Sequence, residues 1–223
     1  MFKVSIVILT YNRINILLNV LEKIYEQNYS NFEIIIINNN STDNTEILLP
    51  QKFPNVKLIN LSKNMGVSGL NFGLETAKGE YILQLDDDSY PEKDTIEKSL
   101  QYFEQNDQLG ILSLKVINLR YNYCETETFQ TKPKLFNGCG VMFAKKLFSK
   151  IGYYNSNIFI YYNELDLTAR CYDAGFQVLY VSDINVYLLQ SSEARISKNT
   201  NPLYSKFRFY HYYLSYFIFL VTY

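Results

Sequence analysis

Short apolar segments alternate with amphipathic segments through the first half of this chain. Residues 4–9, 32–37 and 81–85 are almost wholly apolar, as strands buried on both faces are. Between these runs, apolar residues recur at helical spacing over about 13–28 and 66–77. Strands that alternate with helices pair in parallel and carry helices on both faces of their sheet. The order predicts an α/β fold of Rossmann-like type, with a mixed, mostly parallel sheet and helices on both faces.

Three consecutive aspartates, Asp86, Asp87 and Asp88, directly follow the apolar run 81–85. Carboxylates this dense repel one another unless a cation or donor groups lie among them. In open α/β sheets, ligands bind at the carboxyl ends of strands. A hard divalent cation with a phosphate ligand would suit that place. The alternative is a solvated turn, for which Asp88-Ser89-Tyr90-Pro91 has suitable residues.

Composition limits the class of protein. With 223 residues, 48% of them hydrophobic, the chain can bury a core, and no low-complexity segment divides it into two domains. The 21 basic and 22 acidic residues leave a net charge of −1, without the basic excess of a nucleic-acid-binding protein. The three cysteines form no C-x-x-C pair, and no secretory signal or membrane-spanning run is present. These features predict a reduced, cytoplasmic protein.

The second half of the chain predicts a further lobe that completes the sheet and builds a cleft. Residues 118–134 are polar and irregular, which indicates a loop. A helix is expected over 163–174, with Asn163 at its cap and Gly175 as its stop. The aromatic tail, 202–223, predicts a terminal helix. It would either pack on the domain or lie at a membrane interface, with Lys206 and Arg208 facing lipid headgroups.

Polar clusters occupy four strand or helix ends. In a parallel sheet they would gather along one edge and offer amides, close backbone approach and a cation site, as a nucleotide requires. Any one of them alone is more often a capped loop. The clusters are Thr10-Tyr11-Asn12-Arg13, Asn38 to Asp43, Asn64-Met65-Gly66 and Asp86 to Asp88.

These clusters and their order resemble family 2 glycosyltransferases of the GT-A fold. The similarity extends over roughly residues 3–190, and the run from Asn64 to Gly73 is most similar to the rhamnosyltransferase-like branch. The segments that carry it are VSIVILTYNR at 4–13, NNNSTD at 38–43, NMGVSGLNFG at 64–73, LDDD at 85–88, NGCGVMF at 137–143, IGY at 151–153, and NELDL at 163–167 with Arg170 and Gly175.

The resemblance implies an inverting transfer of a sugar from a nucleoside diphosphate donor to a glycan or lipid-linked acceptor, with UDP or dTDP favoured over GDP. It implies one domain, 1–223, with a donor lobe over about 1–90 and an acceptor lobe over about 91–200. Asp86 would approach the ribose, and Asp88, with Asp86, would ligate a divalent metal, Mn²⁺ or Mg²⁺. The donor-binding residues implied are Thr10, Tyr11, Asn12, Arg13, Asn38, Asn40, Asn64, Gly66, Asn71, Asp86 and Asp87.

Inversion in one step needs a carboxylate that takes the proton of the acceptor hydroxyl. The resemblance assigns this role to Glu164, with Asp166 as the alternative. Asp166 also suits a role in capping the helix, which ranks it second.

Three positions depart from the family's pattern. Asn38 stands in place of an aspartate, Asn163 replaces the first member of an acidic pair, and Leu188 stands where a histidine metal ligand is expected. The departures leave two competing hypotheses: a non-catalytic binding module and a sugar-nucleotide nucleotidyltransferase. The latter usually carries a Gly-rich basic loop after its first strand, which Thr10 to Arg13 is not. The sole histidine, His211, lies in the aromatic tail.

Overall fold

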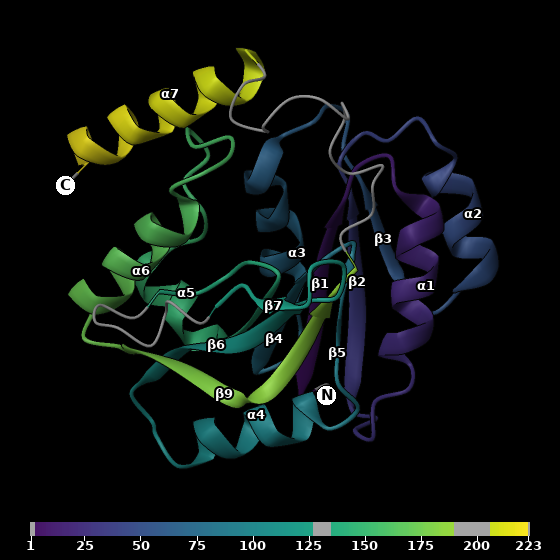
Figure 1. The fold of residues 1–223 in the computed structure, drawn as a ribbon, viewed down its shortest axis with the longest axis horizontal. Coiled ribbons are helices and arrows are strands. Elements are labelled where there is room, and N and C mark those ends of the chain that lie inside the picture. Colours follow the sequence, from purple (N-terminus) through teal and green to yellow (C-terminus); the bar gives the residue numbers. More distant parts are fainter. Residues whose placement is uncertain (1–2, 127–134, 190–205, 223) are drawn as a thin grey trace.

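The computed structural model describes residues 3–126, 135–189 and 206–222. Within these residues a nine-stranded sheet has the order β3-β2-β1-β4-β8-β6-β9-β5, with β7 paired to β6 (Figure 1). The strands are β1 Val4–Thr10, β2 Phe32–Asn38, β3 Lys57–Asn60, β4 Tyr81–Asp86, β5 Ser89–Pro91, β6 Leu109–Asn118, β7 Tyr123–Cys124, β8 Gly140–Ala144 and β9 Gln177–Leu188.

Helices connect most of these strands. The α-helices are α1 Ile14–Ile24, α2 Thr45–Lys52, α3 Leu70–Thr76, α4 Thr95–Glu104, α5 Lys145–Ile151, α6 Asn163–Asp173 and α7 Lys206–Thr222, and a 3₁₀ turn, η1, spans Gly66–Gly69. Of the polar loop expected at 118–134, residues 127–134 lie outside the described part of the chain, as do 202–205 of the expected tail helix.

The sheet is parallel in its first half and mixed in its second. β3, β2, β1 and β4 run in parallel, and Ile8 lies between Ile36 and Leu85. β8 is antiparallel to both β4 and β6, whereas β6 and β9 are parallel. The mixed, mostly parallel sheet predicted from the sequence is confirmed.

Alternate residues of the strands face two different helical layers. Ile6 and Ile8 of β1 belong to a core with α1, α2 and α4, whereas Val7 belongs to a core with α3, α5 and α6. Figure 1 shows α1 and α2 on one side of the sheet and α3, α5 and α6 on the other. This arrangement explains why strands such as β2 are apolar at every position instead of alternating.

Three elements differ from the expectation. Residues 89–91 form strand β5 on β9 instead of a plain turn; Pro91 is tolerated because β5 ends the strand order. No element was predicted at α5, which follows β8 directly and places Leu147 and Phe148 in the core. The cap of α6 is Tyr162, and Asn163 is its first helical residue, so the prediction of Asn163 as the cap was wrong.

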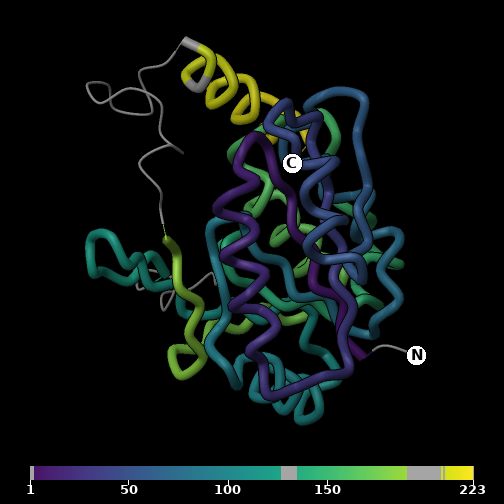
Figure 2. Tube along the Cα trace, turned by 90° about the vertical axis from the view of Figure 1, so that its right-hand side faces the viewer, coloured from purple at the N-terminus to yellow at the C-terminus, as the bar shows by residue number. Residues whose placement is uncertain are grey.

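Helix α7 lies at the end of the molecule toward which β1 runs, and Figure 2 shows it opposite the beginning of β1. It packs on the segment before α6: Ser215 Oγ donates to the Ile160 carbonyl at 2.8 Å, and His211 stacks on Phe159. In the described residues, no helix combines the length and apolarity needed to cross a bilayer.

Candidate active site

A cleft of about 460 Å³ opens at the carboxyl ends of β1 and β4. Its walls come from the loop after β1, the region around η1, the end of β4, the segment before β8 and the segment before α6. The lining side chains discussed below are Thr10, Tyr11, Arg13, Asn39, Asn64, Gly66, Asp86, Asp87, Gly138, Cys139, Tyr161 and Glu164. Parallel strands place their following loops at one sheet edge, which explains how segments from 10 to 164 meet here.

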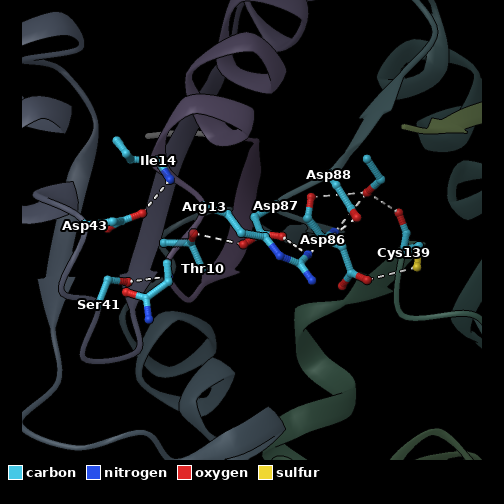
Figure 3. Close-up of polar contacts among 11 residues, drawn as sticks. Thr10, Arg13, Ile14, Ser41, Asp43, Asp86, Asp87, Asp88 and Cys139 are labelled. Carbon is cyan, nitrogen blue, oxygen red and sulfur yellow. Dashed lines mark hydrogen bonds and ion pairs between the residues drawn. The ribbon is translucent and has the colours of Figure 1, made fainter. Parts of the chain in front are cut away.

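Asp87 forms a buried hydrogen bond and a partly buried ion pair at the cleft. Thr10 Oγ1 donates to Asp87 Oδ2 at 2.9 Å, and Arg13 Nη1 lies 2.7 Å from Asp87 Oδ1 (Figure 3). Burial alone would lower the pKa of Arg13, but the attraction of Asp87 and Asp88 raises it, so the guanidinium stays charged. Burial raises the pKa of Asp87, and the charge of Arg13 opposes this effect, so the protein itself supplies a partner for this carboxylate.

Asp88 lies beneath the same guanidinium but is poorly compensated. Arg13 Nη1 is 3.4 Å from Asp88 Oδ2, and the residue is only 6% exposed. Burial, followed by the like charges of Asp86 and Asp87, raises the pKa of Asp88 to about 7. Leu188 of β9 pairs with Ser89, the residue after Asp88, and is buried in the core. Position 188, where a histidine ligand was expected, therefore lies next to the aspartates but carries a side chain that cannot bind a metal.

Asp86 is the exposed carboxylate of the three and lines the cleft. Cys139 Sγ donates a hydrogen bond to Asp86 Oδ2 at 3.0 Å. The backbone carbonyl of Cys139 in turn accepts a hydrogen bond from Ser89 Oγ. Burial and then the charge of Asp86 raise the pKa of Cys139 well above its usual value, which keeps it a thiol. The sequence reasoning missed Cys139; its place between two glycines before a strand was the available signal.

The remaining predicted donor-binding residues divide by location. Thr10, Tyr11, Arg13, Asn64, Gly66, Asp86 and Asp87 line the cleft, whereas Asn12, Asn38, Asn40 and Asn71 do not. Asp88, which was predicted as a metal ligand, does not line it either. Asn39, which was not predicted, does line it, and its amide donates to Asn64 Oδ1 at 3.0 Å.

Asn12, Asn38 and Asn71 are used in loop structure. Asn12 Oδ1 accepts from the Thr42 backbone at 2.7 Å, and Asn38 bonds Asn60 and the Ser41 backbone. The Asn71 amide clamps the backbone of Tyr154, donating to its carbonyl and accepting from its N–H. That these three residues contact a donor stays a prediction. For Asn38, such a contact would require its present hydrogen bonds to Asn60 and Ser41 to rearrange.

Glu164 and Asp166 lie in different surroundings although both belong to the first turn of α6. Glu164 lines the cleft, where a Cβ on Gly138 would lie 3.3 Å from its Oε1. Burial, with a smaller effect of Asp86, raises the pKa of Glu164 to about 7. Asp166 is buried and forms an ion pair with Arg170, which also bonds the carbonyls of Ile151 and Tyr153. Of the two carboxylates, Glu164 lines the cleft and Asp166 does not.

The acidic cluster fits a divalent cation by its chemistry. Among the residues that the structure describes, no group of three or more His, Cys, Asp or Glu side chains is arranged to hold a metal ion. Asp86 and Asp88 nevertheless supply hard oxygen ligands whose repulsion Arg13 leaves partly uncompensated. Magnesium-type sites often use one or two carboxylates and complete their coordination with phosphate oxygens and water.

The fold and the cleft define the class of α/β protein whose ligand site lies at the carboxyl ends of parallel strands. Residues 5–137 match the model of the family described as glycosyl transferase family 2. The chain belongs to this family.

Curated relatives carry glycosyltransferase names. The chain is 31% identical over 182 residues to the uncharacterized glycosyltransferase YwdF of Bacillus subtilis, covering 72% of this chain and 65% of that protein. It is 34% identical over 127 residues to an uncharacterized glycosyltransferase of Rickettsia felis, covering 56% and 21%. The chain thus spans less than two thirds of the length of these relatives.

Solved structures confirm the GT-A fold. The mannosyltransferase PcManGT from Pyrobaculum calidifontis, in complex with GDP-Man and Mn²⁺, superposes with a TM-score of 0.71 at 20% identity, over 95% of this chain and 69% of that one. S. aureus TarS 1-349 in complex with UDP-GlcNAc gives a TM-score of 0.70 at 19% identity, over 88% and 61%.

Proposed function

We propose that this chain transfers a sugar from a nucleoside diphosphate donor to a hydroxyl group of a glycan or lipid-linked acceptor, inverting the anomeric carbon. The observation that carries the proposal is that Asp86 and Glu164 line one cleft from separate parts of the chain. Asp86 ends β4 on the donor side, within about 1–90, and Glu164 begins α6 on the acceptor side, within about 91–200. A one-step displacement needs the departing group and the base on opposite sides of the reacting carbon.

The donor's base and ribose are assigned to the part of the cleft between β1 and η1. Thr10, Tyr11, Asn39 and Asn64 offer hydroxyl, ring and amide groups there. We propose a pyrimidine donor, UDP- or dTDP-linked, over a GDP-linked one. Because TarS was solved with UDP-GlcNAc and PcManGT with GDP-Man, a thermal-shift screen of UDP-, dTDP- and GDP-sugars is the direct test.

In the transfer, the acceptor oxygen bonds to the anomeric carbon while the bond from that carbon to the diphosphate oxygen breaks. The diphosphate departs with the electron pair of that bond, and the Glu164 carboxylate takes the acceptor's proton. A pKa of about 7 makes Glu164 a stronger base than an ordinary glutamate while much of it remains ionised near neutral pH. A divalent ion, Mn²⁺ or Mg²⁺, held by Asp86 and Asp88 would offset the charge of the departing diphosphate.

Replacing Glu164 tests the proposal. Glu164→Gln keeps the shape of the side chain but cannot take a proton, so turnover should fall by about 10²–10⁴ while donor affinity is retained. Glu75→Gln, on the exposed surface of α3, is the matched control and should act as wild type. Undiminished turnover in Glu164→Gln would move the base to Asp166 or elsewhere.

The second candidate is a binding module without catalysis, which the burial of Leu188 and the neutral Asn163 favour. Incubation of a donor sugar with Mn²⁺ or Mg²⁺ separates the hypotheses. Release of free nucleoside diphosphate supports transfer, and pyrophosphate exchange supports a nucleotidyltransferase. Donor binding with neither reaction supports the module.

We further propose a cytoplasmic site of action, with α7 touching the inner face of the membrane. Cys139 must remain a free thiol to donate to Asp86, as a reducing compartment allows. Phe209, Tyr210 and Phe217 of α7 are more than half exposed, and aromatic side chains favour the headgroup region. Flotation with anionic vesicles tests this contact; wild-type binding by Phe209→Ser with Phe217→Ser would contradict it.

A further inference from the structure

A second groove, of about 490 Å³, adjoins the cleft described above at Glu164. It shares Asn137, Tyr161 and Glu164 with that cleft. Its remaining walls are Leu135, Phe136, Tyr162, Leu165 and Tyr212. The carboxylate proposed as the base is therefore open to two neighbouring cavities, of which the nucleotide needs one.

Helix α7 builds the outer wall of this groove. Tyr212 lies 5.7 Å from the Tyr161 ring and 5.3 Å from the Tyr162 ring, centroid to centroid. Ser215, only 1% exposed, bonds the Ile160 carbonyl and fixes the helix against the same segment. Tyr212 also lies far beyond residues 5–137, which match the family model.

The two tyrosines before α6 are held in a strained backbone. Tyr161 has φ +67° and Tyr162 has φ +61°, a region that bulky residues rarely adopt. The contacts of Tyr212, Tyr216 and Phe219 with the Tyr162 ring surround this segment. Such strain persists only where surrounding contacts enforce it, and it is frequent at ligand-binding segments.

The chemistry of the groove restricts its ligand. Of the eight described residues that line it, none is Lys or Arg, so the lining offers no positive charge to balance a phosphate or a carboxylate. Aromatic rings present a negative π face that attracts the C–H groups on one side of a sugar ring. Asn137 and Glu164 can bond hydroxyl groups at the end that meets the donor cleft. The volume is also in the range of about 300–1,000 Å³ that is typical of small-molecule sites.

We propose that this groove is the acceptor subsite and takes a pyranose ring, stacked against the tyrosine wall that α7 completes with Tyr212, with one hydroxyl directed to Glu164. The inference rests on the proposed function, because that function assigns Glu164 the role of the base. It makes α7 part of the binding surface for the acceptor, and Tyr212 a residue that helps to determine which acceptor binds.

Saturation-transfer NMR with methyl pyranosides of gluco, galacto, manno, rhamno and N-acetylglucosamine configuration tests the groove, with and without UDP and Mn²⁺. Tyr212→Ala should weaken binding by about three- to ten-fold, the order of one aromatic contact. Tyr212→Phe keeps the ring and should bind as wild type. The control is Tyr210→Ala, on the same helix and 61% exposed.

The inference is overturned if none of these pyranosides binds, if Tyr212→Ala binds like wild type, or if Tyr212→Phe loses as much as Tyr212→Ala. It is also overturned if farnesyl phosphate, and no pyranoside, shows the dependence on Tyr212. Thermal shifts with UDP-, dTDP- and GDP-sugars are measured on the same variants and should be unchanged. Failure of every donor to bind would refute the proposed function, while Tyr212-dependent binding of a pyranoside would still support the groove.

Discussion

Arg13 is the cation that allows three aspartates to share one strand end. Its guanidinium contacts Asp87 at 2.7 Å and Asp88 at 3.4 Å, while Asp87 is only 5% exposed. Removing one partner of a buried ion pair leaves an uncompensated charge and typically costs about 3–5 kcal/mol. Arg13 itself is partly exposed, so water can relieve part of this loss in an Arg13→Met variant. We expect a loss of about 3 kcal/mol at pH 8.

For a chain of this length, each kcal/mol corresponds to about 2–4 °C in Tm, so the loss should appear as about 6–12 °C. The sign of its pH dependence follows from Asp88, whose pKa is raised to about 7. A carboxyl with a raised folded pKa destabilises the fold in full above that pKa, and the penalty disappears as pH falls toward the unfolded value of about 3.9. Without Arg13, the folded-state pKa values of both Asp87 and Asp88 rise further. The difference in the free energy of unfolding between Arg13→Met and wild type should therefore become smaller from pH 8 to pH 5.

Urea unfolding at pH 8 and pH 5 measures both effects, and Arg120→Met at an exposed position is the control. Adding Asp87→Asn to Arg13→Met should restore most of the loss, since the buried charge is then gone. A loss below about 0.5 kcal/mol for Arg13→Met, or no recovery in the double variant, would refute the account of Arg13 as the compensating charge.

Two further predictions concern the cleft. The value of kcat/KM should rise with pH, reach half its maximum near pH 7 and level off above about pH 8, because Glu164 must be ionised and its pKa is raised to about 7. A half-maximal point near pH 4.5 in the pH profile of kcat/KM would contradict the assignment. Gly66→Ala should lower the free energy of unfolding by at least about 1 kcal/mol, because Gly66 has φ +60° and a Cβ there would lie 2.2 Å from the Phe159 carbonyl oxygen. Urea unfolding measures this loss, and an unchanged free energy of unfolding would show that the fold does not require the close contact between Gly66 and Phe159.

The sequence predicts the strands well because their burial leaves a local signature. β1 and β2 are apolar on both faces, and nothing but a buried parallel strand suits such short runs. It also places the polar clusters at one edge, since parallel strands share their carboxyl ends. These inferences need only neighbouring residues, which a sequence displays directly.

The details that sequence reasoning missed depend on contacts between distant residues. Whether Asn38 or Asn39 faces the cleft depends on where β2 stops, and one residue of shift exchanges the two sides of a strand. The pairing of Arg13 with Asp87 joins residues 74 apart. The position of α7 depends on ring contacts with Tyr161 and Tyr162, which no local pattern encodes.

The balance of charge in the cleft determines how the proposed donor would have to bind. Among the described residues lining the cleft, Arg13 is the one with a positive charge, whereas Asp86, Asp87 and Glu164 are acidic. Because Asp87 already occupies Arg13, an incoming diphosphate would meet mainly repulsion from Asp86 and from Asp88 behind it. A cation arriving with the diphosphate would remove this repulsion and would also offset the charge of Asp88, which lies beside the buried Leu188 and not beside a histidine. If the proposed function is correct, we therefore expect the donor and the metal to bind together, and not the metal beforehand.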